Sequence, residues 1–134
     1  MNYDRMEKLA DLMDKVPSQT LDMDVWCSTH NDLVRFDGTF DCGFAGCAIG
    51  WAIHAGLFEG FRWTPLGLPQ YVPPGYQVAL TSWPAIQVLF EIGEQTAGWL
   101  FSSSCYGDRY SPRIVADRIR DAVRGDKIKM GRHA

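Results

Sequence analysis

Cysteine and histidine are the residue types in this chain whose spacing could support chemistry. The two spaced pairs Cys27-x-x-His30 and Cys42-x4-Cys47 offer four soft or borderline ligands, the kind of donor set that tetrahedral zinc prefers. On one continuous helix, however, Cys42 and Cys47 would point about 140° apart at about 100° per residue. Both thiols then reach one metal only if Cys42 precedes the first turn. We therefore expect no cofactor, and the alternative is zinc bound by Cys27, His30, Cys42 and Cys47.

Cys42 is also a candidate nucleophile, because it stands at the start of an expected helix. The free backbone N–H groups and the dipole of a helix N-terminus favour a thiolate. Residues 40–42 resemble the nucleophile turn of a class of cell-wall peptidases, a resemblance that implies a histidine on a downstream sheet. Here the available base is His30, which precedes the cysteine. We expect a protein that is not an enzyme, with a hydrolase using Cys42 and His30 as the alternative.

The helix expected over residues 43–55 must position these cysteines, and it is apolar on nearly every side. Asp41 or Cys42 would stand at its start, and Gly56 suits the left-handed residue that ends it. Glycines four residues apart leave a flat strip on which another backbone can approach closely. We expect this helix to be buried at the centre of the fold, with packing roles for Cys42, Gly46, Cys47, Gly50 and Trp51.

Apolar residues three and four apart predict helices along much of the chain. One covers residues 3–16 and ends before Pro17, a second begins at Ser82 and ends at Gly93, and a third covers residues 94–101. A short helical piece is expected at 22–26. The last helix begins at Pro112 and ends at Gly125, leaving residues 126–134 as a basic tail. The expected fold class is therefore mainly α, with a single compact domain of about five helices over residues 1–125.

Two long ordered loops are expected between these helices. The first, over residues 57–82, is rich in proline and glycine and contains a short hairpin that joins residues 61–63 to 76–80. The second covers residues 102–111. Tyrosine and tryptophan on loops are frequent anchors for ligands and proteins, although some such rings only cover the core. The expected contact residues are Trp63, Tyr71, Tyr76, Tyr106 and Tyr110.

Charge is distributed unevenly along the chain. Residues 1–112 carry 6 basic and 13 acidic side chains, whereas residues 113–134 carry 7 and 3. An acidic body argues against nucleic acid as a partner. The acidic residues of the N-terminal part, including Asp22 and Asp24, suit a basic surface on a protein partner. No apolar run approaches the ~20 residues of a membrane span, and the first residues lack the pattern of a secretion signal, so we expect a cytoplasmic protein without membrane contact.

The central segment resembles a set of small bacterial and phage proteins. Their mark is a Cys-Gly-Thr-x-x-Cys-x-x-Gly-Trp-Ala core, preceded by Asp-Met-x-x-Trp and followed by a Leu-Phe pair and an Arg-Ile-containing final helix. These features stand here at residues 42–52, 22–26, 100–101 and 116–119, with Phe44 in place of the threonine. The resemblance covers residues 21–123 and implies a small, mainly helical accessory protein encoded by a phage.

The same resemblance implies a function without assigning catalytic residues. Such accessory proteins act on host machinery or on host defence, either by occupying a protein surface or by sequestering a small molecule. The expected function is therefore that of a non-enzymatic binding protein in the host cytoplasm, with a protein or a small molecule of the host cell as its partner.

Overall fold

The computed structural model describes residues 1–23, 26, 46–106 and 110–131. Within these ranges the chain forms five α-helices and a three-stranded antiparallel sheet, so it is mainly helical, as the sequence predicts. The helices are α1 (Tyr3–Met13), α2 (Ala48–His54), α3 (Trp83–Phe90), α4 (Glu94–Phe101) and α5 (Pro112–Gly131). The strands are β1 (Phe61–Trp63), β2 (Pro69–Tyr71) and β3 (Leu80–Thr81), and two short 3-10 helices are η1 (Ser18–Thr20) and η2 (Ser103–Cys105).

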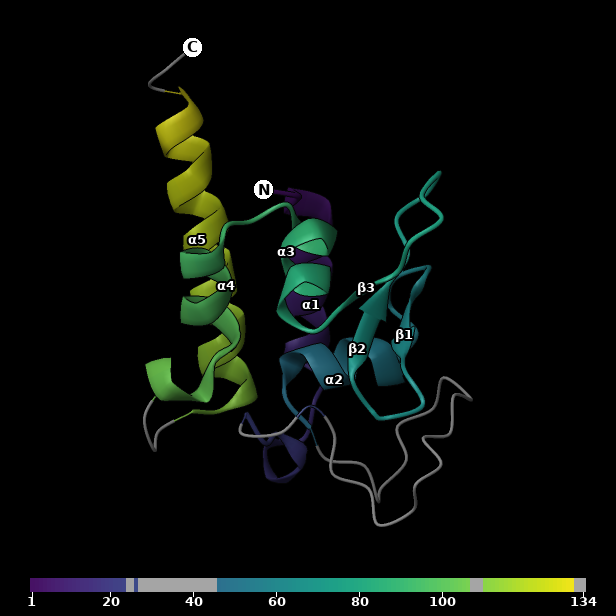
Figure 1. Cartoon of the computed structure of the whole chain (residues 1–134). Helices are drawn as coiled ribbons and strands as arrows, with labels where there is room; N and C mark the ends of the chain where they lie inside the picture. The colour runs from purple at the N-terminus through teal and green to yellow at the C-terminus, as the bar shows by residue number, and fades with distance from the viewer. Residues whose placement is uncertain (24–25, 27–45, 107–109, 132–134) are drawn as a thin grey trace.

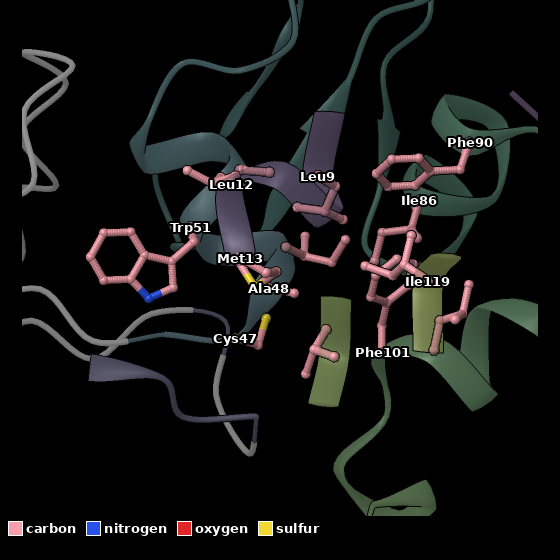
Figure 2. Close-up of a cluster of buried hydrophobic side chains, with 14 of the residues drawn as sticks. Leu9, Leu12, Met13, Cys47, Ala48, Trp51, Ile86, Phe90, Phe101 and Ile119 are labelled. Atoms are coloured by element: carbon pink, nitrogen blue, oxygen red, sulfur yellow. The ribbon is translucent and has the colours of Figure 1, made fainter. Parts of the chain in front are cut away.

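The helices and the sheet surround a shared apolar interior. Figure 1 shows α4 and α5 on one side and the sheet on the other, with α1 and α3 between them. α1 packs along α5, and α3 packs against both β2 and α4. In Figure 2 buried side chains from all five helices meet, among them Leu9, Ala48, Phe90, Phe101 and Ile119. Burial of this apolar surface is the main favourable contribution to folding.

α1 begins where the sequence predicts and ends slightly earlier. The side-chain oxygen of Asn2 accepts a hydrogen bond from the backbone N–H of Arg5 at 3.0 Å, which caps the first turn. Met6, Leu9 and Met13 recur at helical spacing and are fully buried. The helix ends at Met13, before the expected end at residue 16.

α2 is much shorter than the helix expected over residues 43–55. It begins at Ala48, because Cys47 has an extended backbone and Gly46 forms a parallel β-bridge with Leu21. The Gly46 N–H donates to the Thr20 carbonyl at 3.1 Å, and the Gly46 carbonyl accepts from the Asp22 N–H at 2.9 Å. These bonds commit the Gly46 backbone to another segment, so Gly46 is not helical. The expected end at Gly56 is confirmed, since that residue is left-handed with φ of 63° just after the helix.

Two other helix ends were predicted at the wrong glycine. α3 ends at Phe90 and is followed by Glu91, which is left-handed with φ of 55°, whereas Gly93 is extended and precedes α4. The Asn2 side chain donates to the Glu91 carboxylate at 3.0 Å, and the Asn2 N–H donates to the Phe90 carbonyl at 2.8 Å. α5 continues through Gly125 to Gly131, so most of the expected basic tail is helical.

The sheet differs from the expected hairpin in its pairing. β1 pairs with β2, so that Phe61 lies opposite Tyr71, and β3 pairs with the other edge of β2. The hairpin turn is therefore residues 64–68, where Gly67 has a left-handed φ of 80° and the Thr64 hydroxyl accepts from two backbone N–H groups. Residues 72–79 connect β2 to β3.

Candidate functional site

The first candidate, Cys47, is a structural residue in this fold. It is 1% exposed, and its Sγ accepts a hydrogen bond from the Gly50 N–H at 3.4 Å, which caps α2. Burial raises the pKa of its thiol to about 12. A thiol with this pKa is neutral near pH 7, whereas an activated cysteine nucleophile has a lowered pKa. The negative charge of Asp22, which is half-buried, also raises the pKa of Cys47, but by less than burial does.

Close packing surrounds the first turn of α2. A Cβ atom at Gly50 would overlap the backbone carbonyl oxygen of Trp26 and would lie 3.4 Å from the ring of Trp63. The indole N–H of Trp51 donates to the Thr20 carbonyl at 3.1 Å. The structure therefore places Gly50 and Trp51 at a close approach between segments, although the approach involves Gly50 and not the expected strip of two glycines.

The remaining cysteine and histidine candidates lie outside the described residues. Cys27, His30 and Cys42 belong to this group, and so does Asp24. Among the residues that the structure does describe, no three His, Cys, Asp or Glu side chains gather as a metal site would require. The hydrolase and the zinc alternatives thus stay predictions from the sequence.

Three of the five aromatic candidates have side chains that are buried in the core. Trp63 is 8% exposed, Tyr71 2% and Tyr106 8%. Tyr71 packs edge-on against Phe61, and the Tyr106 hydroxyl donates to the Leu100 carbonyl at 2.6 Å. Burial raises the pKa of Tyr106 to about 12, because the phenolate would lose its hydration. Tyr110 is half-buried against Tyr106.

Tyr76 is the aromatic candidate that the structure leaves open to solvent. It is 69% exposed, and Val78, two residues later on the same loop, is 72% exposed. The loop of residues 72–79 projects away from the rest of the fold (Figure 1). Its tip is a turn in which the Tyr76 N–H donates to the Pro73 carbonyl at 3.1 Å and Gly75 has φ of 83°. Proline before a left-handed glycine is the pattern of a type II turn, which restricts the loop backbone.

The acidic side chains of α1 are paired within the fold. The Glu7 carboxylate accepts a hydrogen bond from Lys127 at 3.4 Å, and the Asp11 carboxylate accepts one from Arg120 at 3.0 Å. Asp14 also pairs with Arg120, which lowers the pKa of that carboxyl. The basic end of the chain therefore neutralises its own acidic helix, so this face gives little support to a basic partner.

Sequence reasoning missed Trp99 and Arg118, because both were assigned to helices without a separate role. Trp99 is 44% exposed. The guanidinium carbon of Arg118 lies 4.6 Å from the centroid of the Trp99 ring. The spacing of Ile114 and Arg118 on α5 was a signal that both lie on one face of this helix. Their contact with α4 depends on tertiary packing.

No helix in the described part of the chain is long and apolar enough to cross a membrane. Comparison with known proteins yields no family model, no curated protein and no solved structure that matches this chain. Functional inference therefore depends on the residues and on their geometry.

Proposed function

We propose that this protein is a small, non-enzymatic binding protein that contacts a protein partner through the loop of residues 72–79. The observation that carries the proposal is the exposure of two apolar side chains on this loop, Tyr76 at 69% and Val78 at 72%. Binding is favoured in free energy when a partner covers apolar surface and removes it from water. Tyrosine is also among the residues that most often dominate the energy of a protein interface.

The conformation of the loop favours binding. The turn from Pro73 to Tyr76 is closed by a hydrogen bond, and Pro73 and Pro74 restrict the backbone before Gly75. A loop that is already restricted loses less conformational entropy on binding than a free segment does. Pairing of β3 with β2 holds the far end of the loop in place.

The expected partner is a host protein. The resemblance of residues 21–123 to small bacterial and phage proteins supports a phage-encoded accessory role, directed at host machinery or at a defence system. Occupation of a protein surface is favoured over sequestration of a small molecule, because Trp63 and Tyr71 are buried while Tyr76 projects. A projecting side chain suits contact with another surface.

Site-specific photo-cross-linking in bacterial cells tests this proposal. Benzoylphenylalanine in place of Tyr76 should yield a discrete covalent adduct with one host protein after irradiation. The same photoreactive residue in place of Glu59, an exposed residue on another turn, is the matched control and should yield no such adduct. Adding Val78→Asp to the position-76 probe should abolish the adduct, since a buried charge without a partner is costly.

The proposal is wrong if position 76 gives no adduct, or if positions 76 and 59 give the same adducts. Folding must be monitored in parallel. Tyr76→Ser and Val78→Asp should each change the free energy of unfolding by no more than about 0.5 kcal/mol, because both side chains are exposed. Urea titration followed by circular dichroism measures this.

A further inference from the structure

The guanidinium of Arg118 lies between two aromatic rings where α4, η2 and α5 meet. Its central carbon is 3.8 Å from the centroid of the Tyr106 ring and 4.6 Å from that of Trp99. Its Nη1 donates to the carbonyl oxygens of Trp99 at 2.9 Å and Cys105 at 3.1 Å. Two cation–π contacts and two hydrogen bonds hold this guanidinium in one orientation.

Arg118 differs from its neighbours on α5 in its charge environment. Several other cations of this helix meet carboxylates: Arg113 with Asp117, Arg120 with Asp11 and Asp14, Arg124 with Asp121, and Lys127 with Glu7. No described carboxylate pairs with Arg118. Its two hydrogen bonds to backbone carbonyls both use Nη1, and the guanidinium also lies within reach of the Tyr106 hydroxyl, whose pKa it lowers against the larger effect of burial. Backbone carbonyls satisfy donors without supplying the full negative charge of a counter-ion.

Apolar surface lies beside this guanidinium. Trp99 is 44% exposed and stacks on Arg118, while Ile114 is 42% exposed and stands one helical turn before Arg118 on α5. Residues four apart lie on the same face of a helix. An immobilised positive charge and exposed apolar side chains therefore occupy one surface.

We propose that Arg118, flanked by Trp99 and Tyr106, binds a carboxylate in an acidic peptide segment of a partner protein. The Nε and Nη2 edge of a guanidinium matches the two oxygens of a carboxylate. An apolar side chain next to that carboxylate packs on Trp99 and Ile114. A free phosphate would engage the charge but would leave this apolar surface exposed, so the two features together favour a peptide.

This site is separate from the loop of residues 72–79. The pair α4 and α5 lies on one side of the fold and the loop projects from the other (Figure 1). The inference goes beyond the proposed function, and the two tests fail independently, because one reads cross-linking at position 76 and the other reads peptide binding at Arg118.

Nuclear magnetic resonance of the full chain tests the site with acetyl-Leu-Asp-Leu-amide as the probe. The Nε–H signal of Arg118 and the indole N–H signal of Trp99 should shift together and saturate, with a Kd on the order of 1 mM. Arg118→Lys keeps the positive charge but loses the planar fork, so it should weaken binding about tenfold. Arg113→Gln is the matched control and should bind as the unmodified chain does, since the Arg113 side chain is 88% exposed and pairs with its neighbour Asp117.

A second variant keeps the test decisive if Arg118→Lys does not fold. Ile114→Ser changes a half-exposed side chain, and it should weaken the peptide about threefold while leaving acetate binding unchanged. The proposal is overturned by equal shifts with acetyl-Leu-Asn-Leu-amide, which has no charge. It is also overturned by an absence of saturation up to about 20 mM peptide, or by inorganic phosphate binding more tightly than the peptide.

Discussion

Close packing restricts which residue can stand at a given position of this fold, and Gly50 is the clearest case. Because Gly50 has no side chain, the first turn of α2 can lie against the backbone of Trp26. The ring of Trp26 packs edge-on against the ring of Trp83, with 5.4 Å between the ring centroids. Glycine in a helix costs about 1 kcal/mol relative to alanine. The close approach that it permits offsets this cost.

Replacing Gly50 with alanine should therefore destabilise the protein despite the better helix propensity of alanine. The new Cβ would overlap the Trp26 carbonyl oxygen, which belongs to the backbone and cannot rotate away. We expect the free energy of unfolding to fall by about 1–3 kcal/mol. Gly98→Ala is the matched control, because its Cβ would meet nothing within 4 Å on α4, and it should raise stability by about 0.5–1 kcal/mol. Urea titrations of both variants compare them, and equal effects would contradict the packing role of Gly50.

At the scale of elements, the pairing of α1 with α5 joins the two ends of the described chain. Arg120 donates hydrogen bonds to Asp11 on α1 and to Asp14, which caps the end of that helix, and the Tyr3 hydroxyl donates to Asp126 at 2.6 Å. That hydrogen bond to a carboxylate raises the pKa of Tyr3. These contacts extend past Gly125, so they account for an α5 that continues through a glycine.

Arg120→Gln should lower stability at neutral pH and should do so less in acid. The hydrogen bond from Arg120 lowers the folded-state pKa of Asp14 below its ordinary value of 3.8. The stability from this pair is therefore complete above about pH 4 and is lost as pH falls through the folded-state pKa. The groups are largely exposed, so we expect a loss of at most about 1 kcal/mol at about pH 7.

Urea unfolding at about pH 7 and about pH 3 measures this pH dependence. Arg124→Gln is the control and should have no measurable effect at either pH, because the side chains of Arg124 and Asp121 are 71% and 63% exposed. A loss of stability in Arg120→Gln that is the same at both pH values would show that the Asp14 pair is not its cause.

At the scale of the whole molecule, Phe90 joins the helical side to the sheet side. It is fully buried, with its ring centroid 5.5 Å from that of Phe58, just before the sheet, and 5.6 Å from that of Phe101 on α4. Figure 2 shows its ring beside Ile86 within the buried cluster. A side chain shared in this way couples the stability of the parts that it touches.

Phe90→Ala should lower the free energy of unfolding by about 3–5 kcal/mol, because the cavity lies where two parts of the core meet. Near-ultraviolet circular dichroism follows the aromatic rings and far-ultraviolet circular dichroism follows the helices. The two transitions should coincide and shift together, as expected for a single domain over residues 1–125. Loss of the aromatic signal while the helices persist would instead indicate two separately folding parts. Val88→Ala, at a 42% exposed position on the same helix, is the control with little expected effect.

Local signals in the sequence determined the existence of most elements. The start of α1, the Pro84-containing first turn of α3, the whole of α4 and the start of α5 at Pro112 all follow from contacts within one or two turns. The left-handed Gly56 after α2 belongs to the same group. Capping and apolar spacing act over a few residues, so the sequence alone predicts them. The same local signals placed Tyr76 on a loop with the other aromatic candidates, but they did not separate it from those that the structure buries.

Tertiary structure decided which elements extend and which side chains reach the surface. Gly46 lies outside the helix because Thr20 and Asp22 hydrogen-bond its backbone, and Glu91 is left-handed beside Asn2, which is distant in sequence. The burial of Tyr71 against Phe61 and the stacking of Arg118 likewise depend on partners from other segments. Such contacts compete with local propensities of about 1 kcal/mol per residue and can outweigh them. The sequence by itself determined a mainly helical chain, while long-range packing determined which aromatic rings are buried and left Tyr76 exposed.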